Sequence, residues 1–280
     1  MSGTLFVVAT PIGNLEDLSP RARQTLAEVD IVAAEDTRHT GRLLSHLGLK
    51  KRQFALHEHN ESRATASLIE QLKNGKSVAL VSDAGTPLVS DPGYRLVQSA
   101  HENGIAVSPI PGPSALTAAL SVSGLPTDRF AFEGFPPAKP AARRKWLQAR
   151  AVDERTLVFF EAVHRVTATL EDMVDAFGAD RRAFLGRELT KLHEQCIAAS
   201  LGELLHETGG GGIAAKGEFV IAVHGAGQTA SHSLDTDRLL IELAEALPPK
   251  KAAAIAARLT GEKRNALYQR LLDIRSGGDA

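Results

Sequence analysis

Short apolar runs alternate with amphipathic segments along the first half of the chain. The apolar runs have the length of strands and are bounded by turn-forming residues, which is typical of buried strands. The intervening segments carry helix signals, such as Ser19 before Pro20 at a start and Gly48 at an end. Strands separated by helices predict βαβ units and a mostly parallel sheet. The predicted strands are 4–9, 31–34, 78–81 and 105–110, and the predicted helices are 20–27, 40–47, 61–72, 93–102 and 114–120.

The second half of the chain mixes strand and helix patterns less regularly. A proline-rich run, FPPAKP at 135–140, indicates a linker, and the four glycines at 209–212 indicate a loose loop. The pattern as a whole predicts a second α/β domain. Its predicted elements are strands at 156–160, 183–186 and 219–223 and a helix at 165–177.

The C-terminal part is helical and locally basic, after a predicted linker at 228–233. Two short helices meet at 260–261 in the manner of a helix-turn-helix, which suits nucleic acid, although a solvated helical cap explains the charges equally well. The predicted helices are 237–247, 250–259 and 262–272, and the cations that outnumber Glu262 and Asp273 here are Lys250, Lys251, Arg258, Lys263, Arg264, Arg270 and Arg275. The expected domains are therefore 1–122 and 123–228, both α/β, and a small basic helical domain at 229–280.

Composition changes this picture only slightly. The 280 residues are 43% hydrophobic, and 32 Lys and Arg against 33 Asp and Glu give a formal charge of −1. A protein that binds a polyanion over its whole surface is usually basic, so any nucleic-acid contact must come from local patches. The single cysteine, Cys196, excludes an intramolecular disulfide and favours a cytoplasmic protein, and its apolar neighbours predict a buried side chain. Neither a signal peptide nor a membrane-spanning segment is expected.

Several common motifs are absent from the sequence. It contains no G-x-G-x-x-G after the first strand, no G-x-x-x-x-G-K-[ST] and no G-x-S-x-G, which weakens the hypotheses of a dinucleotide enzyme, a P-loop NTPase and a serine hydrolase. His57 and His59 offer two imidazoles without an evident third ligand, so a polar loop is expected there and no metal site.

Four loops of unusual composition follow the four predicted strands of the first domain. In open α/β sheets, ligands bind beyond the carboxyl ends of the strands, so these loops should converge on one site. The preference of Pro, Gly, Asp and Asn for turns explains the composition of each loop on its own. It explains less well why four such loops follow four strands of one sheet. The loops are TPIGN (10–14), EDTRH (35–39), SDAGTP (82–87) and PGPSA (111–115).

These loops belong to a larger set of motifs, namely ATPIGNLEDLS (9–19), AEDTRHTGRLL (34–44), VSDAGTPLVSDPGY (81–94), PGPSA (111–115), FEGF (132–135), RELTK (187–191), KGEF (216–219), KKAA (250–253) and KRNALY (263–268). With them the chain resembles the tetrapyrrole methylase superfamily from about residue 4 to residue 272, and most closely its branch of small-subunit ribosomal RNA 2′-O-methyltransferases. Porphyrin-type members carry a glycine-rich first loop and a Gly-Asp-Pro motif after the third strand. TPIGN, SDAGTP and the basic tail depart from that pattern and favour the RNA branch.

The resemblance implies two α/β domains with S-adenosylmethionine bound in the cleft between them. It also implies methylation of a cytidine ribose in the decoding region of 16S ribosomal RNA, the small ribosomal subunit as partner and a homodimer. The residues expected to bind the cofactor are Pro11, Ile12, Ser82, Asp83, Ala84, Gly85, Pro87, Ser114, Ala115, Phe160, Leu189 and Thr190, although Asp83 is as well suited to shaping its turn.

Catalysis at a 2′-hydroxyl needs alignment and benefits from a nearby base, since the hydroxyl is a poor nucleophile until its proton can leave. Glu35 or Asp36 is the expected base, with Arg38 and Lys191 in the same catalytic group; an ion pair that holds the loop is the alternative for the acidic residues. For Arg187 and Glu188, an ion pair that holds the two domains in register is an alternative of equal weight to a role in the site. The residues expected to bind RNA are Arg38, His39, Lys250, Lys251, Lys263 and Arg264.

Two other functions stay open at this point. One is methylation of a small tetrapyrrole, which an apolar cleft of macrocycle size would favour. The other is a non-catalytic ribosome-binding factor, which a failure to bind S-adenosylmethionine would favour.

Overall fold

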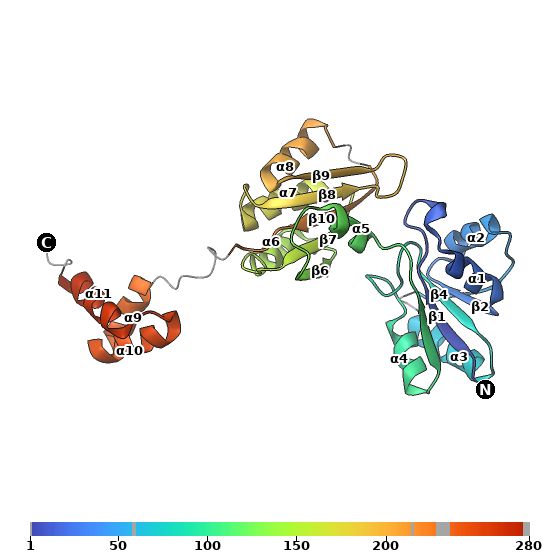
Figure 1. The fold of residues 1–280 in the computed structure, drawn as a ribbon, viewed down its shortest axis with the longest axis horizontal. Coiled ribbons are helices and arrows are strands. Elements are labelled where there is room, and N and C mark those ends of the chain that lie inside the picture. The colour runs from blue at the N-terminus through green and yellow to red at the C-terminus, as the bar shows by residue number, and fades with distance from the viewer. Residues whose placement is uncertain (1, 58–59, 214–215, 228–235, 277–280) are drawn as a thin grey trace. The chain divides into compact units, whose positions relative to one another are not determined.

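The computed structural model describes residues 2–57, 60–213, 216–227 and 236–276 (Figure 1). They form two compact units, Met1–His224 and Gly225–Ala280. The first unit contains two five-stranded sheets, and the second is helical. The α/β class and the helical C-terminal region are therefore confirmed, whereas the boundaries at residues 122 and 228 stay predictions.

The first sheet is parallel throughout, with the strand order β3-β2-β4-β1-β5. Parallel neighbours need crossover connections, and the helices between the strands provide them. The strands are β1 (Thr4–Val8), β2 (Ile31–Ala34), β3 (Arg52–Ala55), β4 (Val78–Val81) and β5 (Ala106–Ile110), and the helices are α1 (Pro20–Glu28), α2 (Thr37–His46), α3 (Glu61–Lys73) and α4 (Tyr94–Glu102), with a 3-10 turn η1 (Leu15–Asp17).

Helices cover both faces of this sheet, which explains why its central strands are apolar without interruption. In β4, Ala79 and Val81 pack with Leu26 of α1 and Leu44 of α2. The alternate residues of the strand, such as Leu80, pack with α3 and α4 on the other face. The apolar runs in the sequence are thus strands buried from two sides.

The second sheet is mixed, with the order β6-β7-β10-β8-β9. Its first pair is parallel, and the other pairs are antiparallel. The central position belongs to β10, which follows the other four strands of this sheet in the sequence. The strands are β6 (Phe130–Gly134), β7 (Thr156–Ala162), β8 (Arg182–Arg187), β9 (Gln195–Ser200) and β10 (Glu218–Val223).

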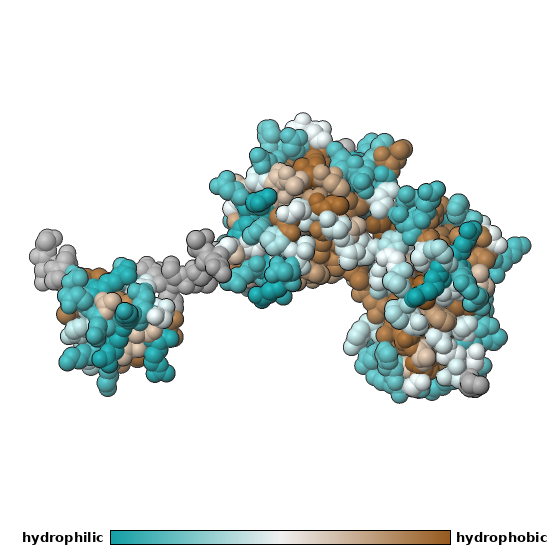
Figure 2. Space-filling model, viewed as in Figure 1, coloured by the Kyte–Doolittle hydropathy of each residue, from teal (hydrophilic) through white to brown (hydrophobic). Residues whose placement is uncertain are grey.

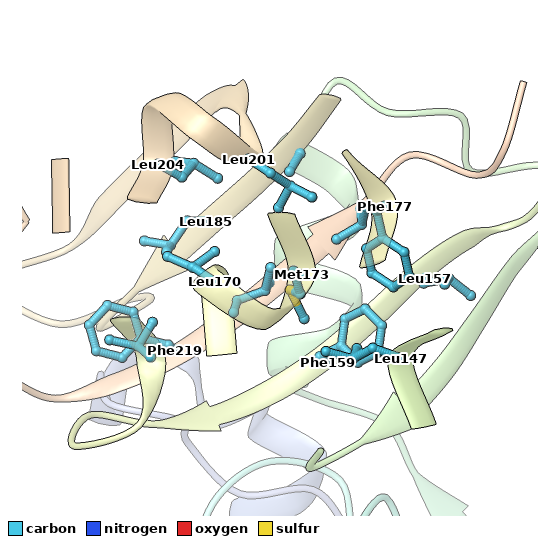
Figure 3. Close-up of a cluster of buried hydrophobic side chains, with 14 of the residues drawn as sticks. Leu147, Leu157, Phe159, Leu170, Met173, Phe177, Leu185, Leu201, Leu204 and Phe219 are labelled. Atoms are coloured by element: carbon cyan, nitrogen blue, oxygen red, sulfur yellow. The ribbon is translucent and has the colours of Figure 1, made fainter. Parts of the chain in front are cut away.

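Three helices, α6 (Pro140–Gln148), α7 (Val166–Phe177) and α8 (Leu201–Gly210), cover one face of the second sheet. Figure 3 shows the core that they share with it, in which Leu170 and Met173 of α7 lie among side chains from β7, β8 and β10. The opposite face packs against α5 (Ala115–Val122) and also against Ile12, from the first loop of the other sheet. This second face is the one that borders the site described below.

The C-terminal unit consists of α9 (Thr236–Ala246), α10 (Pro249–Thr260) and α11 (Arg264–Ser276). Its core is small and includes Leu240, Ala253, Leu267 and Leu271. The visible face of this unit is largely hydrophilic (Figure 2). The three predicted helices are confirmed, and the predicted linker at 228–233 lies outside the described residues.

Five strands and helices were not predicted: β3, β6, α6, β9 and α8. The edge strands β3 and β9 have polar or exposed positions, so they lack the apolar runs that mark central strands. The predicted linker at 135–140 is wrong, because this segment joins β6 to α6 beside the second sheet.

Two smaller predictions about loops and burial are also wrong. Gly209 and Gly210 form the last turn of α8, with Gly211 in the left-handed conformation as its cap, so the glycine run is not a loose loop. Cys196 is exposed, because alternation along the edge strand β9 points its side chain outward.

Candidate active site

The first and third loops of the first sheet are held together by backbone pairing. The Thr10 amide donates to the Gly85 carbonyl at 2.8 Å, and the Gly85 amide donates to the Thr10 carbonyl at 3.0 Å. The Thr10 hydroxyl also donates to the carbonyl of Ser82 at 3.2 Å. Gly85 has a φ of 84°, and a Cβ there would lie 3.3 Å from Cγ2 of Ile12. The turn therefore favours glycine on both conformational and steric grounds.

The other two loops are tied to the same centre. The Asp36 amide donates to Oδ1 of Asp83 at 3.1 Å, which joins the second loop to the third. The Thr86 hydroxyl donates to the Pro113 carbonyl at 3.1 Å, which joins the third loop to the fourth. All four loops at the carboxyl ends of the parallel strands are thus linked by hydrogen bonds, in the arrangement that open α/β sheets use for ligands.

These loops and the second sheet together enclose a cavity of about 490 Å³, which we call the acidic cavity. It has five carboxylates in its lining, and the described part of the chain contributes no Lys or Arg to it. This lining favours a cationic ligand and disfavours a phosphate. The residues that line it are Ile12, Glu35, Asp83, Ala84, Gly85, Thr86, Val89, Ser90, Asp91, Ser114, Ala115, Phe135, Phe160, Glu161, Ala162, Glu218, Phe219 and Val220.

A second cavity of about 330 Å³, the basic cavity, adjoins the first. The two share Ile12, Ala84 and Glu218. One face of α2 supplies His39, Arg42, Leu43 and His46, a spacing of three, four and seven residues that brings side chains into line on a helix. The remaining lining residues are Pro11, Gly13, Leu15 and Lys191.

Asp91 lines the acidic cavity, and its protonation equilibrium is shifted toward neutral pH. Burial raises the pKa of its carboxyl to about 6, and the negative charge of Asp83 adds to this effect, against a hydrogen bond from the Ser82 hydroxyl. A carboxyl group with a pKa near neutrality in a cavity is typical of functional sites.

The Asp36 carboxylate is engaged in contacts at the start of α2. Its carboxylate accepts hydrogen bonds from the backbone amides of Arg38 and His39 at the start of α2 and pairs with the Arg38 guanidinium at 2.9 Å. The Arg38 side chain and amide hold the pKa of Asp36 well below its usual range. Arg38 itself is largely exposed, at 86% of its side chain, and lines neither cavity. This pair corresponds to the alternative of a loop-holding ion pair.

Lys191 lies where the loop after β8 meets the first loop. Its ammonium contacts Glu188 at 2.8 Å and Glu218 at 2.9 Å. Burial alone would lower the pKa of Lys191, but the hydrogen bonds to the two carboxylates raise it above its usual value, so the side chain stays cationic. A Cβ on Gly13 would lie 2.2 Å from Cγ of Lys191. Gly13 therefore allows the lysine stem to cross the first loop at close range.

Backbone strain is concentrated in two segments of the site. Leu88 and Ser90 have φ values of 72° and 69°, and Glu188 and Thr190 have values of 51° and 67°. Non-glycine residues adopt this region at a cost, and such residues are enriched where a structure fixes a ligand. The Thr190 hydroxyl is also buried without a hydrogen-bond partner among the described residues.

Glu161 anchors the wall that the second sheet contributes. Its side chain is buried and accepts hydrogen bonds from the Thr169 hydroxyl at 2.6 Å and from Arg165 at 3.1 Å. A buried charge satisfied in this way is stable only as part of the network. We therefore assign Glu161 to the framework of the cavity.

The structure brings most of the predicted cofactor residues together. Ile12, Asp83, Ala84, Gly85, Ser114, Ala115 and Phe160 line the acidic cavity. Pro11 lines the basic cavity, whereas Ser82, Pro87, Leu189 and Thr190 line neither cavity. Of the predicted catalytic residues, Glu35 lines the acidic cavity and Lys191 the basic one.

Arg187 and Glu188 do not make the ion pair that the sequence suggested. Arg187 donates to the carbonyl oxygens of Lys216 and His193, and Glu188 accepts from Lys191. Both residues thereby fix the loop between β8 and β9.

Sequence reasoning missed Asp91, Phe135 and Glu218 in the acidic cavity and Arg42 and His46 in the basic one. A signal existed for the basic cavity, since His39, Arg42 and His46 are spaced to share a helix face. Phe135 ends the motif FEGF (132–135), but it also begins the predicted linker at 135–140 and was therefore not assigned to the site.

The C-terminal unit has a small groove of its own, about 190 Å³, between α10 and the start of α11. It is lined by Lys250, Ala253, Arg264, Asn265 and Tyr268. Lys251 and Lys263, the sequence neighbours of Lys250 and Arg264, are exposed but do not line the groove. Two of the four tail residues expected to bind RNA thus line this groove.

No trio of metal-ligating side chains occurs within the described ranges, and His59 lies outside them. Among the described helices, none has the length and apolar character needed to cross a bilayer.

Two family models match the chain. Residues 4–205 match Tetrapyrrole (Corrin/Porphyrin) Methylases, and residues 230–275 match the RsmI C-terminal HTH domain. Among solved structures, the chain resembles uroporphyrin-III-C-methyltransferase from Thermus thermophilus, with a TM-score of 0.56 and 22% identity over 79% of this chain and 94% of that one. It also resembles diphthine synthase, with a TM-score of 0.58 and 17% identity over 79% and 90%. These structural likenesses establish the fold.

Sequence relatives are much closer. Proteins named ribosomal RNA small subunit methyltransferase I are 52% identical over 267 residues in Xylella fastidiosa, covering 95% of this chain and 98% of that protein. The relative in Pseudomonas aeruginosa is 52% identical over 274 residues, covering 97% of both chains. The relative in Escherichia coli is 50% identical over 272 residues, covering 97% and 95%. The chain therefore belongs to the ribosomal RNA small subunit methyltransferase I family, within the tetrapyrrole methylases.

Proposed function

We propose that this chain transfers a methyl group from S-adenosylmethionine to the ribose 2′-hydroxyl of a cytidine in the decoding region of 16S ribosomal RNA. Its relatives of about 50% identity carry the name of a small-subunit ribosomal RNA methyltransferase. The observation that carries the proposal is the pair of adjoining cavities, one acidic and one basic, that share the wall formed by Ile12, Ala84 and Glu218.

The acidic cavity fits the cofactor in charge and in shape. S-adenosylmethionine bears a sulfonium and an ammonium, and five carboxylates without a lysine or arginine in the described lining complement both. The close turn at Gly85 is a further feature that a bound ligand would explain. Its volume lies within the range of sites for small molecules, about 300–1,000 Å³.

The chain's residues would bind and orient the cofactor from both sheets. The loop at 82–85 and the start of α5 at Ser114 and Ala115 form one side, and Phe160 forms part of the other. Leu189 backs this wall in the apolar cluster that includes Ile12 and Phe184. When bound, S-adenosylmethionine supplies a methyl group that its sulfonium already activates. The protein's main contribution is therefore alignment and the exclusion of water.

Proton removal from the 2′-hydroxyl falls to Glu35 in this proposal. Glu35 lines the acidic cavity, whereas the Asp36 carboxylate is occupied with Arg38 and the start of α2. Lys191 stays charged, so it serves by holding Glu218 at the shared wall and by its positive charge toward RNA. Glu35→Gln should lower kcat about 100-fold while the affinity for S-adenosylmethionine changes little. Unchanged turnover in Glu35→Gln would leave alignment as the catalytic device.

The basic cavity and the C-terminal unit are the proposed RNA contacts. His39, Arg42 and Lys191 line the former, and Lys250 and Arg264 line the groove of the latter. Cationic side chains of this kind bind phosphates and fix the register of RNA without reading sequence. The formal charge of −1 is compatible with this arrangement because the contacts are local.

We also propose that the protein acts in the cytoplasm on the assembled small subunit and forms a homodimer, as the family resemblance implies. An assembled particle offers shape as well as phosphates for recognition. Sedimentation equilibrium of the full chain tests the dimer, and a monomer at all concentrations would contradict it.

The experiment that tests the proposed function measures methyl transfer from labelled S-adenosylmethionine to small ribosomal subunits from cells that lack this protein, with naked 16S RNA in parallel. Mass spectrometry of the digested RNA then locates the label. One ribose-methylated cytidine is the expected result. Cofactor binding without transfer to either substrate would overturn the proposal.

A further inference from the structure

Phe135 is a large apolar side chain that remains exposed at the acidic cavity. It is 55% exposed and lines the cavity. Its ring packs edge-on against Phe160, with centroids 5.8 Å apart and planes at 68°. Phe160 is itself braced by Phe132 at 4.8 Å. Aromatic packing thus fixes Phe135 on one side and leaves the rest of its surface open to a ligand.

Asp91 lies on a segment that adjoins Phe135. A Cβ on Gly134 would be only 3.5 Å from the Ser90 hydroxyl oxygen, so the residues that precede Phe135 and Asp91 are close neighbours. Asp91 also lines the acidic cavity. Burial raises its pKa to about 6, so the carboxylate is the major form at neutral pH, and a carboxylate can only accept hydrogen bonds.

An aromatic ring beside an acceptor-only group matches the chemistry of a nucleobase. Bases taken out of a stack are held on aromatic side chains, and Asp or Glu accepts a hydrogen bond from the exocyclic amine of cytosine. Uracil presents a carbonyl oxygen where cytosine has its amine, so a carboxylate would then face a second acceptor. Phosphate is a poor fit, because the described lining of the acidic cavity has no Lys or Arg.

We propose that Phe135 and Asp91 form a receptor for the target nucleobase, in which Phe135 stacks on an unstacked base and Asp91 accepts a hydrogen bond from its exocyclic amine. The inference rests on the proposed function and adds to it the residues that select the base. It assigns the phosphates to the basic cavity and places the base beside the cofactor, at the part of the acidic cavity that Phe135 and Asp91 line.

The stacking half of the proposal is tested with Phe135→Leu in the full chain. We expect KM for small subunits to rise about 10- to 100-fold with the affinity for S-adenosylmethionine nearly unchanged. Phe135→Trp should retain the wild-type KM, because it keeps an aromatic face. Phe130→Leu is the matched control, since Phe130 begins the strand β6 that Phe135 directly follows, is 42% exposed and is outside the cavity lining. An unchanged KM in Phe135→Leu, or an equal rise in Phe130→Leu, would overturn the proposal.

The base-reading half is tested with subunits reconstituted from RNA in which uridine replaces the mapped target cytidine. Wild type should prefer the native subunit about 100-fold. An amide can rotate to present either its oxygen or its NH₂ group, so Asp91→Asn should keep most of its activity on the native subunit and lower the preference to about 10-fold or less. Loss of turnover on both substrates with the preference unchanged would instead make Asp91 a proton acceptor and overturn its role as a reader.

The wild-type assay distinguishes failure of the proposed function from failure of the nucleobase receptor. If wild type labels no RNA at all, the proposed function fails and the receptor falls with it. If wild type labels the target while Phe135→Leu and Asp91→Asn behave like wild type, the proposed function stands and only the receptor is overturned.

Discussion

The acidic and basic cavities share a wall, but they are built from different kinds of structure. The acidic cavity is bounded largely by tightly linked loops and strand ends, such as the turn at Gly85 and the buried Glu161. The basic cavity takes most of its basic side chains, His39, Arg42 and His46, from one exposed helix face. A fixed frame suits a small ligand of constant shape, whereas long exposed cations adapt to a large polyanion. The difference suggests how one chain handles two substrates of unlike charge side by side.

Reversing a charge in the acidic cavity should have the largest effect. Asp83→Lys places an ammonium among carboxylates that we assign to a cationic cofactor, and we expect S-adenosylmethionine to bind about 100-fold more weakly by calorimetry. Asp83→Asn is the control, because an amide oxygen can still accept the hydrogen bond from the Asp36 amide. It should cost about 10-fold or less. Equal losses in both variants would show that the loop geometry matters and the charge does not.

Reversing a charge in the basic cavity should affect only the RNA side. For Arg42→Glu we expect small-subunit binding to weaken about 10- to 100-fold at moderate salt, while Arg42→Ala should flatten the salt dependence by about one phosphate contact. Arg23→Glu on α1 is the control, since Arg23 is exposed but lines neither cavity. Filter binding across a salt series measures both. A comparable loss in Arg23→Glu would assign the effect to overall charge.

The wall between the cavities can be disturbed without changing any charge. In Gly13→Ala, the new methyl group would lie 2.2 Å from Cγ of Lys191, so the lysine must leave its position between Glu188 and Glu218. We expect kcat to fall about 10-fold with smaller changes in either binding step, since alignment is lost. Gly41→Ala is milder sterically, with its nearest contact at 3.4 Å, and should leave kcat unchanged. Wild-type kcat in Gly13→Ala would show that the position of Lys191 is unimportant.

The smallest effect concerns stability and pH. The pKa of Asp91 is about 6 in the folded chain against an ordinary value of 3.8, so the folded state binds more protons between these values and loses stability as pH rises through that window. Asp91→Asn has no charge to desolvate. It should therefore be more stable than wild type at pH 7.5, by about 1 kcal/mol or less after solvent screening, and no more stable at pH 4. Thermal unfolding at the two pH values measures this, and an equal shift at both would mean that packing is responsible.

The sequence predicts the parallel sheet well because burial on both faces leaves a plain signal. Residues 31–34 and 78–81 are entirely apolar and are strands at those bounds. Edge strands give no such signal: β3 reads RQFA, and β9 alternates so that Cys196 points outward. Periodicity reports burial, so elements that are half exposed escape it.

The candidate site, too, could be predicted only in part from the sequence. Loops such as SDAGTP could be placed at one sheet edge, because the order of parallel elements brings their carboxyl ends together. The same reasoning could not place Phe135, Asp91 and Glu218 at the site, since they come from the second sheet or from the far end of a loop. Whether Asp36 is a base or a cap also depends on its contacts with Arg38, which composition does not reveal.

The central place of β10 has a consequence for the order in which the protein is made. The first sheet has all its strands once residue 110 has been synthesised, whereas the second sheet lacks its middle strand until residue 223. Glu218 and Val220, on that strand, also line the acidic cavity. During translation the N-terminal half can fold early, but the site cannot exist until β10 inserts between β7 and β8. A chain that terminates before β10 would thus retain the first sheet, but neither cavity would be complete.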